Sequence, residues 1–315
     1  MVDGVRGIRV LDGEEANKYL QIINIFHNVA QKYDFSFIKI PTIEKDELFT
    51  RTVGENTDIV TKQMFSFPDK KGRNLVLRPE GTAGVVRHHL DKKYNEVKKY
   101  YYSDQMFRYE RPQKGRYREF HQVGAEIIGY ENNSILDIFT IIQLSNDFLE
   151  NCIPTNIKYS FEINSIGTNE DRKIYNQELN EYFKQNIDNL SDDSINRLDK
   201  NPLRILDSKD TNDITISRNA PKLSEFRSKE SNKKYNELIQ MLKDSKISYS
   251  ENPFLVRGLD YYNDFTFEIV PENSKGSQDA LGGGGQYDNL SKLLGGKDNN
   301  GVGVAFGVDR IMELN

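Results

Sequence analysis

The chain has 315 residues, and its 43 Lys and Arg against 48 Asp and Glu give a formal net charge of -5. This length corresponds to about two domains, and 17 Phe and 17 Tyr provide bulky side chains for a core, which argues against wholesale disorder. No apolar run approaches the roughly 18 residues of a membrane span, and the first residues lack the pattern of a secretion signal.

The N-terminal third predicts two helices and two short strands. Residues 14–34 repeat apolar side chains at helical spacing, which predicts an amphipathic helix. Residues 35–40 alternate like a strand and stop at Pro41, which cannot donate a ladder hydrogen bond. Residues 75–77 predict a second strand, and residues 82–93 a second helix.

The middle of the chain predicts a long hairpin followed by helices. Residues 98–108 and 119–128 read as strands on either side of a very polar connection. Residues 134–149 have a strongly periodic helical pattern. From about 169 to 250 the chain is charged, helix-prone and nearly free of strand pattern, which predicts an inserted helical module.

Strand pattern frames this insertion on both sides. Residues 157–163 precede it, and residues 265–270 and 302–308 follow it. A run of glycines at 282–285 and a short helix near 288–294 lie between the last two strands. This order predicts an α+β fold with a mainly antiparallel sheet flanked by helices, not a doubly wound nucleotide fold.

One face of the predicted hairpin is polar. Because side chains alternate across a strand, Gln122, Gly124 and Glu126 share a face. That face is either a floor that a small polar ligand approaches, with Glu126 accepting from an amine, or a solvent-exposed face of an antiparallel sheet.

The connection of the hairpin is rich in arginine. Arg108 ends its first strand, beside the proposed floor, and Arg111, Arg116 and Arg118 follow in the connection. Arginine forks match phosphate oxygens, but a solvated turn can be equally basic. Arg108 is therefore more informative than the others.

Three segments near the C-terminus are further candidates. Residues 257–262 (RGLDYY) form either a turn with surface aromatics or a binding wall for a polar ligand. The run 282–285 permits close backbone approach but lacks the Gly-Lys-Ser/Thr ending of a phosphate-cradling Walker loop. Arg310, early on a helix, either stacks on a base or covers the surface.

The single cysteine and the histidines indicate little chemistry. Cys152 excludes an internal disulfide and a cysteine metal cluster within this chain, fits a reducing cytosol, and is predicted to be a buried small hydrophobe. His121 falls on the apolar side of its strand, so it is predicted to be packed and not catalytic.

Four stretches, in this order, resemble the histidyl-tRNA synthetase family of class II aminoacyl-tRNA synthetases. They are LRPEGT at 77–82, FRYERPQKGRYREFHQVGAE at 107–126, RGLDYY at 257–262 and LGGGGQYD at 281–288. The similarity runs from near Val5 to the last residue. One departure is Asp309, where the family usually has a glutamate before the arginine.

The resemblance implies a domain arrangement. Residues 1–168 and 251–315 would form the class II catalytic domain, and residues 169–250 a helical insertion domain. The family's C-terminal anticodon-binding domain is expected to be absent. The region 14–41 looks like motif 1, which implies a homodimer; a cytoplasmic protein without membrane contact is expected.

The resemblance also implies the substrates: ATP with Mg²⁺, L-histidine and histidine tRNA. Arg108 would bind the α-phosphate, and Arg310 the adenine and γ-phosphate, with Glu110 and Arg116 completing the ATP site. Arg257 and Arg108 would be the catalytic pair. The need for a metal beyond the one that accompanies ATP stays open.

The remaining family positions concern histidine and tRNA. Gln113 and Arg116 would approach the acceptor end of the tRNA. The predicted histidine-binding residues are Glu80, Thr82, Gln122, Glu126, Arg257, Tyr261, Tyr262 and Tyr287.

Two other functions remain in view. The regulatory subunit of ATP phosphoribosyltransferase is a synthetase-like protein that binds histidine without aminoacylation, and other synthetase-like modules serve only as dimeric partners. Such paralogues generally lose parts of the catalytic set, whereas Glu80, Arg108, Arg116, Arg257 and Arg310 are all present here. The set therefore favours an active synthetase core.

Overall fold

The computed structural model describes residues 2–55, 57–130, 135–199, 201–206, 208–272 and 279–314. The chain divides into two compact units. The first comprises Met1–Ser160, Leu259–Tyr261 and Glu268–Asn315, and the second comprises Phe161–Gly258 and Tyr262–Phe267. Within the described ranges, no helix combines the length and apolar character that crossing a bilayer requires.

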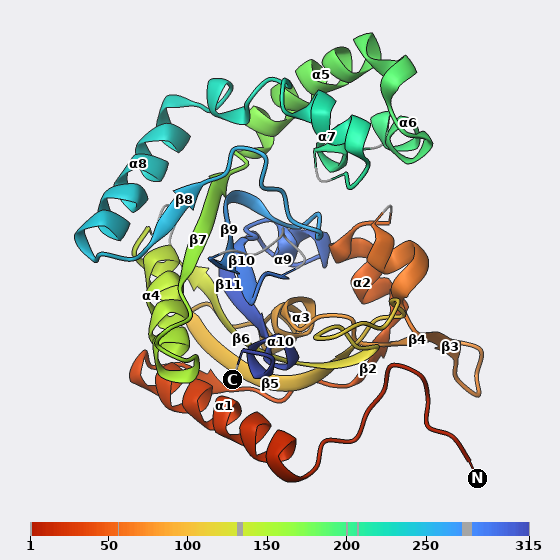
Figure 1. Cartoon of the computed structure of the whole chain (residues 1–315), viewed down its shortest axis with the longest axis vertical. Coiled ribbons are helices and arrows are strands. Elements are labelled where there is room, and N and C mark those ends of the chain that lie inside the picture. Colours follow the sequence, from red (N-terminus) through yellow and green to blue (C-terminus); the bar gives the residue numbers. More distant parts are fainter. Residues whose placement is uncertain are drawn as a thin grey trace. The chain divides into compact units, whose positions relative to one another are not determined.

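A mostly antiparallel sheet forms the centre of the first unit (Figure 1). Its strands, in spatial order, are β1 (Ser36–Phe37), β5 (Lys98–Phe107), β6 (Glu119–Tyr130), β11 (Asn300–Gly307), β10 (Gly282–Gln286) and the end of β9 (Asn263–Pro271). Strand β1 runs parallel to its neighbour β5, whereas the pairs β5–β6, β6–β11 and β11–β10 are antiparallel. The predicted α+β class with a mainly antiparallel sheet is confirmed.

Helices α1 (Gly13–Lys32) and α4 (Ile135–Cys152) lie side by side against the apolar face of this sheet (Figure 1). Phe26 of α1 and Phe148 of α4 meet edge to face, with ring centroids 4.9 Å apart. Phe148 is also 4.9 Å from Phe306 of β11. Cys152, at the end of α4, is buried as predicted. Burial of these rings fixes which face of the sheet is left for polar residues.

The opposite face of the sheet is approached by the start of α3 (Thr82–Lys92). Strand β6 places Val123 and Ala125 on the apolar side, so Gln122, Gly124 and Glu126 point to the α3 side. Helix α10 (Val308–Met312) follows directly from β11 at the end of the chain. The polar face therefore lies between strands from distant parts of the sequence.

A small three-stranded sheet precedes α3. It has the order β2 (Ile43–Lys45), β4 (Asn74–Leu77) and β3 (Ser66–Pro68), and α2 (Asp46–Val53) and the π-helical turn η1 (Ile59–Gln63) connect its strands. Phe49, Val53 and Val76, all fully buried, form its core with Ala83 of α3. The sequence predicted only the strand at 75–77 in this region.

The glycine run is a strand in the structure. Residues Gly282–Gln286 form β10 and pair with β11, and a Cβ built on Gly282 would lie 2.7 Å from the carbonyl oxygen of Ala305. Glycine has a low intrinsic strand preference, so the sequence of residues 282–286 did not indicate a strand. The short helix α9 (Leu290–Leu293) follows it.

The second unit is mainly helical. It contains β7 (Tyr159–Ser165), which pairs in parallel with β8 (Tyr249–Glu251), and the first part of β9. Its helices are α5 (Asn169–Gln185), α6 (Asp192–Leu198), α7 (Thr211–Ser217) and α8 (Lys229–Asp244), joined by the 3₁₀ turns η2 (Ile187–Asn189), η3 (Pro202–Ile205) and η4 (Leu223–Glu225). These helices lie in the segment predicted to be helical; its standing as a separate insertion domain stays a prediction.

Candidate functional site

Glu80 caps the first turn of α3. Its carboxylate accepts hydrogen bonds from the backbone amides of Thr82 at 2.7 Å and Ala83 at 2.9 Å. Burial raises the pKa of Glu80 above its usual range, although these two amides oppose the shift. The hydroxyl of Tyr261 donates to the same carboxylate at 3.3 Å. The helix N-terminus therefore holds a buried acceptor in place.

A second buried carboxylate, Glu126, lies next to this helix start. Its two oxygens accept from the hydroxyls of Thr82 and Tyr287, each at 2.6 Å. Glu126 has no exposed surface. Burial raises its pKa to about 8 despite the two hydroxyl donors, and the nearby Glu80 adds to the rise. The polar face of the hairpin is thus enclosed, which excludes the solvent-exposed alternative for Glu126.

Glycines on β11 leave room for this carboxylate and its tyrosine. Gly303 lies opposite Glu126 in the strand register, and a Cβ built on Gly303 would be 1.7 Å from Glu126 Oε2. A Cβ on Gly301 would be 2.1 Å from Cε2 of Tyr287. Neither spacing function was predicted. Gly303 lies in the strand predicted at 302–308 and Gly301 directly precedes it, and glycines at such positions can mark a close approach of other groups.

Arg108 joins the carboxylate pair to the arginine-rich connection. Its Nε donates to the carbonyl of Pro79 at 2.9 Å, one residue before Glu80. Burial lowers the pKa of Arg108, and the charges of Glu110 and Glu80 oppose that effect. An arginine side chain remains a cation under these conditions. One peptide segment, residues 79–82, therefore contacts both the arginine and the two carboxylates.

The connection after Arg108 is a tight turn with paired charges. Gln113 and Arg116 exchange backbone hydrogen bonds of 3.0 and 2.9 Å. Arg116 Nε lies 2.5 Å from Glu110 Oε2. Arg118 places its guanidinium carbon 3.7 Å from the ring centroid of Tyr109. These basic side chains are ordered by specific partners within the turn.

Asp309 and Arg310 lie in the first turn of α10, where Asp309 accepts hydrogen bonds and Arg310 donates one. Asp309 is buried and accepts from the backbone amide of His121 at 2.7 Å and from Arg9 at 2.8 Å. Burial alone would raise its pKa, but His121 and Arg9 outweigh burial and lower it. Arg310 donates to the carbonyl of Ala280. The shorter acid at 309 thus contacts both His121 and Arg9, and the sequence did not single out Arg9.

His121 and Gln122 differ as predicted from the strand alternation. The His121 ring packs 4.7 Å from the ring of Tyr19. The side chain of Gln122 is half-buried, and its Oε1 has no hydrogen-bond partner among the described residues. A buried amide oxygen without a protein partner suits a donor on a ligand. The ring of Tyr261 meets that of Tyr287 edge-on, with centroids 5.9 Å apart.

Arg257 and Tyr262 belong to the second unit. The guanidinium carbon of Arg257 lies 5.8 Å from the ring centroid of Tyr262. The carbonyl of Tyr262 accepts from Arg172 at 2.9 Å. The structure therefore brings these two predicted residues together with each other, within their own unit.

Arg78 is a buried residue to which the sequence assigned no role, although it lies in the LRPEGT stretch. It is 1% exposed and donates to the carbonyls of Gln105 at 2.7 Å and Ile40 at 2.5 Å. It also forms an ion pair with the buried Asp104 at 3.0 Å. These contacts anchor the chain just before Glu80. An arginine directly after a buried apolar run was the available signal.

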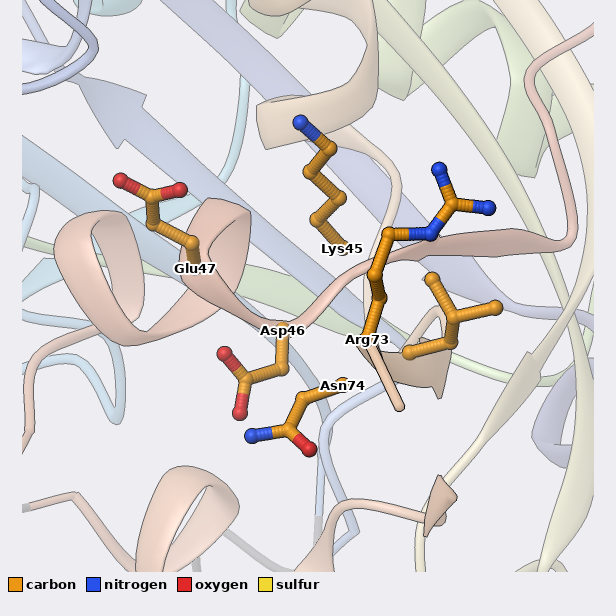
Figure 2. A pocket seen from close by; sticks show the side chains of 6 residues that line it. Lys45, Asp46, Glu47, Arg73 and Asn74 are labelled. Atoms are coloured by element: carbon orange, nitrogen blue, oxygen red, sulfur yellow. The ribbon is translucent and has the colours of Figure 1, made fainter. Parts of the chain in front are cut away.

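A separate pocket of about 420 Å³ lies at the three-stranded sheet and involves none of the predicted site residues. Figure 2 shows Lys45 and Arg73 pointing to one side of it and Asp46 and Asn74 to the other. Arg73 is already paired with Asp69 at 2.6 Å. Over the whole described part of the chain, no three His, Cys, Asp or Glu side chains gather as a metal site would require.

Comparison with known sequences identifies similar proteins along the whole chain. A sequence model of the family described as histidyl-tRNA synthetase matches residues 7–311. The histidine–tRNA ligase of Campylobacter hominis is 40% identical over 317 residues, covering 100% of this chain and 76% of that protein. The chain therefore spans about three quarters of this relative's length.

Comparison with solved structures gives the same fold. The apo histidyl-tRNA synthetase of S. aureus superposes with a TM-score of 0.78 at 32% identity, covering 100% of this chain and 73% of that chain. A Bacillus halodurans protein described as an ATP phosphoribosyltransferase regulatory subunit/histidyl-tRNA synthetase has a TM-score of 0.72 at 22% identity, covering 100% and 84%. At that identity the second likeness concerns the fold alone.

Proposed function

The chain belongs to the histidyl-tRNA synthetase family, and on this premise we propose that it activates L-histidine with ATP and transfers the histidyl group to the 3′ end of histidine tRNA. The observation that carries the proposal is the junction at residues 79–82. There a half-buried cation, Arg108, and two buried carboxylates, Glu80 and Glu126, converge on the start of one helix. Such a site can receive a phosphate on one side and an ammonium on the other.

The carboxylate side is the proposed histidine site. Glu80 and Glu126 would accept from the amino and imidazole groups, together with Thr82 and the open amide oxygen of Gln122. Tyr261 and Tyr287, which already contact the two carboxylates, would close the pocket. We include Arg257 and Tyr262 in this site from the family resemblance. A pocket that hydrogen-bonds the imidazole rejects amino acids that leave its buried groups unpaired.

The arginine side is the proposed ATP site. Arg108 would bind the α-phosphate, Arg310 the adenine and γ-phosphate, and the ion pair Glu110–Arg116 would complete it. A carboxylate oxygen of histidine attacks the α-phosphorus, and the bond from that phosphorus to the bridging oxygen breaks, so pyrophosphate leaves. Arg108 and Arg257 stabilise the charge that grows on the α-phosphate oxygens.

Transfer and assembly complete the proposal. The terminal ribose hydroxyl of the tRNA attacks the adenylate carbonyl and releases AMP, with Gln113 and Arg116 placed near the acceptor end. The chain would pair as a homodimer through residues 14–41. Mg²⁺ would accompany ATP, because this ion is commonly held by substrate phosphates and few protein carboxylates. A purely regulatory, histidine-binding role is not favoured, because relatives named as ligases match the whole chain at about 40% identity.

Histidine-dependent exchange of pyrophosphate into ATP tests the proposal directly. The unaltered chain should catalyse it, and Arg257→Ala should lower the rate by on the order of 10²–10³ while leaving the oligomeric state unchanged. Arg218→Ala is the control, because it makes the same change of charge in the same unit. Arg218 is an exposed arginine at the C-terminal end of α7. Histidine binding without exchange by the unaltered chain would support the regulatory alternative instead.

A further inference from the structure

Tyr102 lies on the same face of the sheet as the proposed histidine site. In the register of β5 and β6 it stands opposite Gly124, between the pairs Tyr100–Glu126 and Asp104–Gln122. Cross-strand partners point to the same side, so Tyr102 faces the start of α3 with Gln122 and Glu126. It has no exposed surface.

The phenol end of Tyr102 touches a glycine on each side. A Cβ built on Gly124 would lie 2.3 Å from Tyr102 Cζ, and a Cβ built on Gly81 would lie 2.4 Å from the same carbon. Real Cβ atoms do not approach ring carbons so closely. Tyr102 therefore separates the backbone of β6 from the backbone at the beginning of α3.

Both glycines are required by space and not by backbone conformation. Gly81 precedes α3 with φ -99°, a value open to any residue, and Gly124 has no positive φ. A methyl group at either position would have only Tyr102 atoms as its nearest neighbours, two ring carbons and the hydroxyl oxygen. The three residues thus form one stack, in which the Tyr102 ring lies between Gly124 of the sheet and Gly81 at the start of α3.

The residues that flank Gly81 are those of the proposed histidine site. Glu80 precedes it and Thr82 follows it, and Thr82 reaches Glu126 across the same gap with a 2.6 Å hydrogen bond. A thinner spacer would let the helix start move toward the sheet and would shift the Glu80 carboxylate. Displacements near 1 Å in a site can cost on the order of 10²-fold in rate.

We propose that Tyr102 is a positioning residue whose ring thickness sets the height of Glu80 and Thr82 above β6, and with it the fit of histidine. This inference rests on the proposed function. It predicts that changes at Tyr102 act mainly on histidine and little on ATP, because the ring touches Gly81, between Glu80 and Thr82. Arg108, by contrast, is held by the carbonyl of Pro79.

The test compares variants in pyrophosphate exchange, with KM measured separately for histidine and ATP. Tyr102→Leu should raise the KM for histidine about tenfold or more, with the KM for ATP within about threefold. Tyr102→Phe, which keeps the ring, should stay near the unaltered chain. Tyr101→Leu is the matched control: it makes the same substitution one residue earlier, on the apolar face, where it should lower Tm without raising the KM for histidine.

A compensation experiment separates spacing from general packing. Gly124→Ala should raise the KM for histidine because its methyl group pushes the ring toward Gly81. In the double variant Tyr102→Leu/Gly124→Ala, the increase in the KM for histidine should be smaller than the product of the two single increases, by about threefold or more. If the leucine variant fails to fold, Tyr102→Met, closer to the ring in length, takes its place in both experiments.

The outcomes separate this proposal from the proposed function. No exchange by the unaltered chain would overturn the function itself, whatever the variants do. Normal exchange in the unaltered chain with an unchanged KM for histidine in Tyr102→Leu would overturn the spacer alone. Equal losses in the phenylalanine and leucine variants would also overturn it, because the hydroxyl and not the ring thickness would then carry the effect.

Discussion

Two buried carboxylates, one in each unit, show how similar burial leads to different electrostatics. Glu126 in the first unit accepts from two hydroxyls, and burial raises its pKa to about 8. Asp213 in the second unit accepts from the amide of Ser191 and from the hydroxyls of Ser191, Ser194 and Ser208. Burial also works against the Asp213 anion, but these donors outweigh it and lower its pKa.

The difference lies in the number of donors that the protein itself supplies. A buried anion is stabilised when its oxygens accept several hydrogen bonds, and Asp213 is a saturated structural acceptor by that measure. Glu126 is under-supplied, and the adjacent Glu80 adds repulsion. A cationic ligand would supply what is missing. Carboxylates with raised pKa in an enclosed face are therefore candidates for binding, whereas saturated ones hold the fold.

The largest effect should follow from removing the charge of Glu126. Glu126→Gln takes away a counter-charge for histidine, so the rate of pyrophosphate exchange at low histidine should fall by on the order of 10²–10³, as for the loss of a buried charged partner. Steady-state exchange at varied histidine and ATP measures this loss. An exchange rate within threefold of the unaltered chain would contradict the role of Glu126.

The same variant has an opposite expected effect on stability. The pKa of Glu126 rises from 4.5 in the unfolded chain to about 8, so the folded state binds its proton more tightly. The stabilisation from this group is complete below pH 4.5 and is lost as the pH rises toward 8. Glu126→Gln should therefore unfold at higher denaturant concentration than the unaltered chain at pH 8 and show a smaller difference at pH 5. A constant difference across this range would refute the raised pKa.

Asp213→Ala tests the other side of the comparison. Its loss leaves three serine hydroxyls without their acceptor, so the second unit should lose about 2–4 kcal/mol of unfolding free energy. Because the pKa of Asp213 is lowered, its stabilisation is present above pH 3.8 and disappears as the pH falls through the folded-state pKa. Denaturant unfolding at pH 7 and at pH 3 should show a larger difference from the unaltered chain at pH 7 than at pH 3. An equally large difference at both values would mean that the ionised form is not what stabilises the unit.

Gly303→Ala should have an intermediate effect on the site. Its methyl group would occupy the position of Glu126 Oε2, and overpacking of this kind costs about 1–3 kcal/mol. The displaced carboxylate should raise the KM for histidine by about tenfold or more. Gly295→Ala is a control for a glycine change outside the site, because no atom lies within 4 Å of a Cβ built there. The φ of Gly295 is +80°, so this variant should also lose some stability. Similar histidine KM values in the two variants would contradict a specific role for Gly303.

The sequence predicted the sheet and its helices because periodic burial determines them. The hairpin 98–128, the helix 134–149 and the helical segment after residue 169 all appear with boundaries near those predicted. The elements between Pro41 and Asn74 were not predicted, since β2 and β3 have three residues each and show no buried alternation. The strand β10 was hidden for a different reason: four glycines carry no side-chain pattern at all.

Part of the candidate site could be predicted and part could not. Alternation placed Gln122 and Glu126 on one face, and the family resemblance named most of their partners. No local pattern brings Thr82 to Glu126, because that contact depends on how α3 meets β6, 44 residues along the chain. Gly301 and Tyr102 were missed for the same reason: a spacer is recognisable only when both of its neighbours are in place.

The smallest effect should come from Tyr287→Phe, which removes one donor of Glu126 and keeps the ring. The lost hydrogen bond leaves the carboxylate less stabilised, so its pKa should rise further and the KM for histidine should increase about threefold to tenfold. The ring keeps its edge-on contact with Tyr261, so stability at pH 5 should hardly change. The test is the KM for histidine measured from pH 6 to 9. The KM should fall as the pH rises and Glu126 ionises, and in the variant this fall should occur at higher pH. An unshifted profile would mean that Tyr287 shapes the pocket without tuning the charge of Glu126.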